Sequence, residues 1–93
     1  MNPVKSEDRL VLITTRQRPH MVAPIADYWA STGKVVIYVD RDDTMMPAYV
    51  DACEQAGIEL LIGSRFGIRE VAERYADSYT AVIVVDDHSV HPE

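Results

Sequence analysis

The sequence predicts an α/β fold in which four parallel strands alternate with three helices, a three-layer, Rossmann-like β-α-β-α-β-α-β arrangement. Three short, continuous apolar runs, at residues 10–13, 35–39 and 81–85, are typical of strands buried on both faces, and a less continuous run at residues 58–62 indicates a further strand. The segments between them carry apolar residues at helical spacing, and the connections are short. Right-handed crossovers and the usual order of doubly wound sheets then give a four-stranded parallel sheet with strand order 3-2-1-4.

The first strand is followed by a loop at residues 14–19, and Pro19 suits the first turn of a helix. Pro24 lacks a backbone donor, so we expect regular helix only from about Val22. Gly33 is a natural stop for this helix. Its apolar stripe consists of Val22, Ile25, Ala26 and Trp29.

The second strand ends in the acidic segment Asp40–Asp43. Thr44 can cap the next helix, which has Pro47 in its first turn and is closed by Gly57. The buried stripe of this helix is expected to contain Tyr49, Val50, Cys53 and Ala56.

The third strand is less continuous than the others, so we expect it at one edge of the sheet. A loop at residues 63–67 leads to the third helix, from Ile68 to Tyr75, and then to the fourth strand. That helix covers one face almost alone, and the fourth strand becomes an open apolar edge. Such an edge is normally paired or covered. We therefore expect a homo-oligomer, another partner, or a chain that is half of a larger unit.

The 93 residues are expected to form a single domain, residues 1–93, with 47% hydrophobic and 26% charged residues. The net charge of −6 argues against nucleic acid or an anionic membrane as the main partner, because both require a basic surface. The polar first nine residues do not resemble a signal peptide, and one cysteine excludes an internal disulfide. A cytoplasmic location is the resulting expectation.

Acidic residues follow the second and fourth strands, at the edge where open α/β sheets bind ligands. They are Asp40, Asp42, Asp43, Asp86 and Asp87. Because this charge repels a phosphate, we expect a divalent metal, Mn²⁺ or Mg²⁺, with Asp86, Asp87 and His88 as ligands. Further positive charge for a diphosphate could come from Arg16, Arg18 and Arg65.

Simpler interpretations remain open for some of these residues. Asp42 and Asp43 could lie in solvated turns, whereas Asp40 and Asp86 directly follow buried strands and are the stronger ligand candidates. His88 would be a surface histidine were it not for its acidic neighbours. No Gly-x-Gly-x-x-Gly follows the first strand, and the chain has no P-loop, nucleophile elbow or paired cysteine-histidine zinc spacing.

Four segments, in order, resemble the nucleotide-sugar-binding half of a GT-A fold glycosyltransferase of the family 2 type. Leu12–Pro19 is similar to the first strand and loop, which meets the nucleoside in that family, and Val39–Asp43 is similar to the acidic end of the second strand. Gly67–Ala76 resembles the glycine-led helix before the fourth strand. Val84–His88 occupies the place of the Asp-x-Asp motif, with His88 where the second aspartate is usual.

The resemblance implies binding of a nucleoside diphosphate or nucleotide sugar through a divalent metal. The implied nucleotide-binding residues are Thr14, Thr15, Arg16, Arg18, Asp40, Asp42, Arg65 and Asp86. In the family, a second half carries the acceptor contacts and, in inverting members, the catalytic base, so this chain is expected to bind rather than to complete a transfer. Two alternatives are a non-catalytic interaction module that uses the fourth strand's edge and a small regulator that binds another phosphorylated metabolite.

Overall fold

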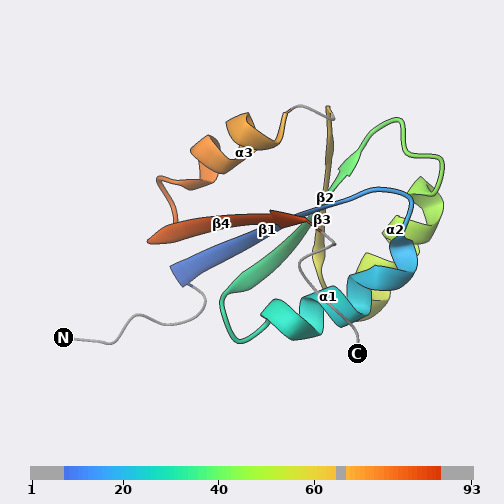
Figure 1. Cartoon of the computed structure of the whole chain (residues 1–93), viewed down its shortest axis with the longest axis horizontal. Coiled ribbons are helices and arrows are strands. Elements are labelled where there is room, and N and C mark those ends of the chain that lie inside the picture. Colours follow the sequence, from blue (N-terminus) through green and yellow to red (C-terminus); the bar gives the residue numbers. More distant parts are fainter. Residues whose placement is uncertain (1–7, 65–66, 87–93) are drawn as a thin grey trace.

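The computed structural model describes residues 8–64 and 67–86, which form a four-stranded parallel sheet with helices on both faces (Figure 1). The strand order is β3-β2-β1-β4, which confirms the predicted topology. The elements in chain order are β1 (Arg9–Thr15), the 3₁₀ turn η2 (Pro19–Met21), α1 (Val22–Trp29), β2 (Lys34–Asp40), α2 (Met46–Ala56), β3 (Glu59–Gly63), α3 (Ile68–Tyr75) and β4 (Ala81–Asp86).

Helices α1 and α2 cover one face of the sheet, and this face holds the larger core. Alternate side chains of β1 and β2 point into it because successive residues of a strand face opposite ways. Cys53 and Tyr49 are both buried there, as predicted. The fully buried members of this core are Val11, Ile13, Val22, Ile25, Ile37, Val39, Tyr49 and Cys53.

Among the described residues, α3 is the one helix on the other face (Figure 1). Its contacts with the sheet are mainly with β1 and β4. The buried side chains under it come from β1 and β2 and are Leu10, Leu12, Val36 and Tyr38. The prediction that one helix must serve this face is therefore confirmed, and the surface over β2 and β3 is left less covered.

Two predicted helix ends need correction, and a third is confirmed. Thr44 does not cap α2: no side chain caps this helix, and Asp43 Oδ1 accepts the backbone N–H of Met45 instead, at 2.8 Å. Helix α1 ends at Trp29, before Gly33, where a Cβ would lie 2.5 Å from the carbonyl oxygen of Arg9. Gly33 therefore allows the backbone at this position to lie close to the backbone of Arg9, where a Cβ would not fit.

The predicted stop of α2 at Gly57 is confirmed. This residue has a left-handed φ of 68° and donates its N–H to the last turn of the helix. Glycine adopts that conformation without the steric cost that a Cβ would add.

Strands β3 and β4 form the two edges of the sheet. Edge position was predicted for both. In β4 the exposed fraction of Val84 is 48%, although four of the six residues of the strand are β-branched. An apolar strand with one unpaired side is therefore a feature of the described fold.

Candidate functional site

The order of the strands along the sheet reverses between β1 and β4, and the carboxyl ends of both strands lie at the same edge. Thr14 of β1 pairs in register with Asp86 of β4, and Thr15 pairs with Val39, directly before Asp40. Alternation along the strands places Thr14, Asp40 and Asp86 on the face that α3 covers. The sheet thus places three of the predicted nucleotide-binding residues at the same edge and on the same face.

Thr14 and Asp86 are the closest of these residues to the strand reversal. The hydroxyl of Thr14 donates to the carbonyl of Val85 at 3.4 Å, and the side chain of Asp86 is exposed. Asp40 lies across β1 from Asp86, about 10 Å away at two strand spacings. A hydroxyl and a carboxylate therefore lie at the reversal of strand order, with a second carboxylate on the far side of β1.

Asp40 also orders the loop that follows it. Its Oδ1 accepts the backbone N–H of Asp42 at 3.0 Å, and its carbonyl accepts the N–H of Asp43 at 2.9 Å. Asp42 itself is exposed, in agreement with a solvated turn. The Asp40 carboxylate is thus partly engaged by the chain and still half-exposed.

Asp43 is not in a solvated turn, because only 8% of it is exposed. Its Oδ2 accepts the backbone N–H of Gln17 at 2.8 Å, and its Oδ1 accepts that of Met45. Gln17 has a left-handed φ of 53°, so the loop after β1 is held in an uncommon conformation at the point of contact. This carboxylate joins two loops that are far apart in sequence.

Tyr49 makes the second tie to the same loop. Its ring is fully buried, and its hydroxyl lies 2.9 Å from the hydroxyl of Thr15 and accepts the backbone N–H of Arg18 at 2.8 Å. Thr15 is therefore buried on the α2 face, opposite Thr14. The sequence predicted that Tyr49 is buried in the core, but it did not indicate the hydrogen bonds of its hydroxyl. The alternation of side chains along β1 could have shown that Thr15 and Thr14 lie on opposite faces of the sheet.

The side chains of Arg16 and Arg18 are exposed on this ordered loop. Arg65, Asp87 and His88, the remaining predicted site residues, lie outside the described residues. Within residues 8–64 and 67–86, no three histidine, cysteine, aspartate or glutamate side chains come together as metal ligands. Asp86 supplies one carboxylate of the predicted metal set. Asp40 is too far from it to share one ion at the usual ligand distance of about 2 Å.

Comparison of the chain with protein-family models, with curated proteins and with solved structures gives no match. The resemblance to glycosyltransferases therefore rests on the sequence motifs. In the part of the chain that the structure describes, no helix is long and apolar enough to cross a membrane.

Proposed function

We propose that this chain binds a nucleoside diphosphate or nucleotide sugar at the crevice between β1 and β4, as a glycosyltransferase-like donor-binding domain. The observation that supports this most is the pairing of Thr14 with Asp86 at the reversal of strand order. Ligands of open α/β sheets bind at this kind of reversal, outside the carboxyl ends of the strands.

The ordered loop after β1 gives the proposal a second support. Asp43 and Tyr49 accept backbone N–H groups of this loop, and Arg16 and Arg18 are exposed residues on it. A guanidinium can bind phosphate oxygens through two parallel N–H donors. Because the loop is already held, less conformational entropy is lost when a diphosphate binds to it.

Carboxylate oxygens suit Mg²⁺ or Mn²⁺, and Asp86 is the described residue that would hold such an ion, together with the predicted ligands Asp87 and His88. When bound, the ion would neutralise charge on the diphosphate. The chain's own contribution would be to bind and orient: Thr14 offers a hydroxyl, and Asp40 offers an acceptor for a base or ribose.

Titration calorimetry with uridine diphosphate, with and without MnCl₂, tests the proposal. We expect binding that requires the metal and that Asp86→Asn weakens about tenfold or more, the usual effect of losing a charged contact. Asp77→Asn is the matched control, because Asp77 is exposed in the turn between α3 and β4, near the amino ends of the strands and away from the proposed site. Absence of heat at millimolar nucleotide with manganese would refute the proposal, as would equal weakening by both variants.

A second candidate function is a non-catalytic interaction module that oligomerises through β4. The exposed Val84 and the unpaired edge of its strand favour it. We expect an oligomer whose mass depends on concentration, that persists in Asp86→Ala and that Val84→Lys disrupts. Val50→Lys serves as control, because Val50 is 44% exposed on α2. A monomer at all concentrations in light scattering would rule this function out.

A further inference from the structure

A groove runs between α3 and the outer part of the sheet, on the face opposite α1 and α2. It arises because α3 packs mainly over β1 and β4 and leaves β2 and β3 partly uncovered. The groove has a volume of about 540 Å³, within the roughly 300–1,000 Å³ of small-molecule sites. Leu61 and Val71 provide apolar surface, one from β3 and one from α3. It lies to one side of the crevice between β1 and β4.

Tyr38 and two glycines build one end of this groove. The Tyr38 hydroxyl donates to the carbonyl of Ser64, and the residue is 4% exposed. A Cβ at Gly63 would lie 2.5 Å from that hydroxyl, and one at Gly67 would lie 2.9 Å from it. Gly63, Ser64 and Gly67 therefore lie close around the tip of the ring and close this end of the groove.

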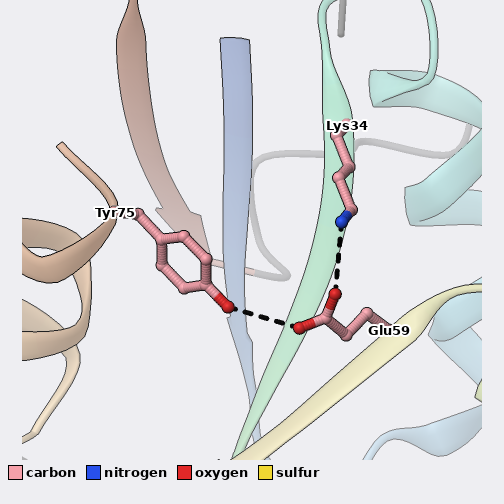
Figure 2. Close-up of polar contacts among 3 residues, drawn as sticks. All are labelled: Lys34, Glu59 and Tyr75. Carbon is pink, nitrogen blue, oxygen red and sulfur yellow. Dashed lines mark hydrogen bonds and ion pairs between the residues drawn. The ribbon is translucent and has the colours of Figure 1, made fainter. Parts of the chain in front are cut away.

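Tyr75 of α3 forms part of the wall farther along. Its hydroxyl donates to Glu59 Oε2 at 3.2 Å, and Lys34 Nζ lies 3.2 Å from Glu59 Oε1 (Figure 2). The hydrogen bond to Glu59 raises the pKa of Lys34. These contacts connect α3 to β3 and β2, and they pair the carboxylate of Glu59 with a cation. Side-chain contacts among Tyr75, Glu59 and Lys34 therefore hold this wall of the groove to the sheet.

Two guanidinium groups and one carboxylate line the groove: Arg41 after β2, and Arg74 and Glu70 on α3. Burial raises the pKa of Tyr38; the two arginines act against that rise, and the carboxylates of Asp40 and Glu70 add to it, so charges of both signs lie near the tyrosine hydroxyl. Within residues 8–64 and 67–86, neither arginine forms an ion pair. Among the residues that line the groove, two arginines therefore accompany one glutamate, in a chain whose net charge is −6.

We propose that this groove binds a small organic anion with a flat apolar body and one phosphate or carboxylate group. The apolar body would lie on Leu61 and Val71 beside the tyrosine rings, since mostly apolar pockets with a few placed polar groups are typical of such sites. The anionic group would meet Arg41 or Arg74, because guanidinium groups bind phosphate and carboxylate through paired hydrogen bonds. The site does not depend on Asp86 or on a metal.

Amide chemical shifts of the ¹⁵N-labelled chain, recorded during titration, test this inference with three probes. Phenyl phosphate has both the apolar body and the charge, inorganic phosphate has only the charge, and benzyl alcohol has only the body. We expect phenyl phosphate to shift the amides of Gly63, Gly67 and Val71, with an affinity about tenfold above that of either partial probe. The Asp86→Asn variant should bind it equally well.

The double variant Arg41→Gln/Arg74→Gln should weaken phenyl phosphate about tenfold or more. Arg69→Gln is the control: like Arg74→Gln, it removes one positive charge from α3, but Arg69 lies on the side of the helix next to β4. Circular dichroism of each variant establishes that it is folded. The inference fails if millimolar phenyl phosphate causes no shifts, if it shifts only Thr14 and Asp86, or if the double variant binds as tightly as the control.

Discussion

Replacing Asp43 by asparagine should destabilise the fold, even though the two side chains have nearly the same shape. The carboxylate accepts one backbone N–H through each oxygen, from Gln17 and from Met45, both at 2.8 Å. Asparagine keeps one acceptor oxygen and replaces the other with an NH₂ group. That group would face an N–H donor in a place that is 8% exposed, so at least one charge-assisted bond is lost.

A hydrogen bond that involves a charged group contributes about 1.5–3 kcal/mol to the free energy of unfolding. With about 2 kcal/mol lost, and roughly 4–8 °C for each kcal/mol in a domain of this size, the melting temperature should fall by about 8–16 °C. Urea unfolding followed by circular dichroism measures the effect. The midpoint should fall while the slope with denaturant stays the same, because the surface exposed on unfolding is unchanged.

Asp42→Asn is the matched control for this experiment. It removes the same charge one position earlier, but Asp42 is exposed, and its hydrogen bond to Asp40 uses the backbone N–H rather than the side chain. An exposed substitution of this kind should change stability by no more than about 0.5 kcal/mol. If the two variants unfold at the same urea concentration, the carboxylate of Asp43 does not hold the loops together, and the reasoning is refuted.

Three further predictions concern the core and the turns. Tyr49→Phe should lower the free energy of unfolding by about 1–3 kcal/mol in urea, because it removes the two hydrogen bonds that join α2 to β1 and the following loop; an unchanged midpoint would contradict this. Gly33→Ala should lower the free energy of unfolding by about 2–3 kcal/mol, because the added Cβ would meet the backbone of Arg9. Gly57→Ala should lower it by only about 1–2 kcal/mol, because its Cβ would contact no other atom and only the left-handed backbone conformation is unfavourable for alanine. If both variants lose the same free energy of unfolding, the close approach at Gly33 is contradicted. Burial raises the pKa of the Cys53 thiol, so less of it is thiolate at pH 8 than in a free cysteine. A chromogenic disulfide should therefore react with it at the rate of unfolding, and rapid reaction in the native state would disprove its burial.

The sheet could be predicted from the sequence because its signals are local and strong. The apolar runs from Leu10 and from Val35 are short and rich in β-branched residues, which favours a strand covered on both faces. The handedness of the crossovers then leaves few strand orders, and the observed 3-2-1-4 order is the predicted one. That order makes β1 and β4 neighbours, and it places the residues at their carboxyl ends, such as Thr14 and Asp86, at the same edge of the sheet.

The roles of individual polar residues could not be predicted in the same way. Asp42 and Asp43 are neighbours with the same side chain, yet one is exposed and the other buried against the loop after β1. That difference depends on a loop 26 residues away in sequence, which no local pattern encodes. The bonds of the Tyr49 hydroxyl and the groove beside α3 likewise depend on how α2 and α3 are placed over the sheet.

The pairing of β1 with β4 also has a consequence for how the chain acquires its structure during synthesis. β2 is complete at Asp40, but the other side of β1 has no neighbour until Asp86 has been added. At about 5–20 residues per second, translation of the intervening 46 residues (86 − 40) takes roughly 2–9 s. For that interval β1 has unpaired backbone N–H and C=O groups along one side, so the nascent chain can pair there with another chain until β4 has been made.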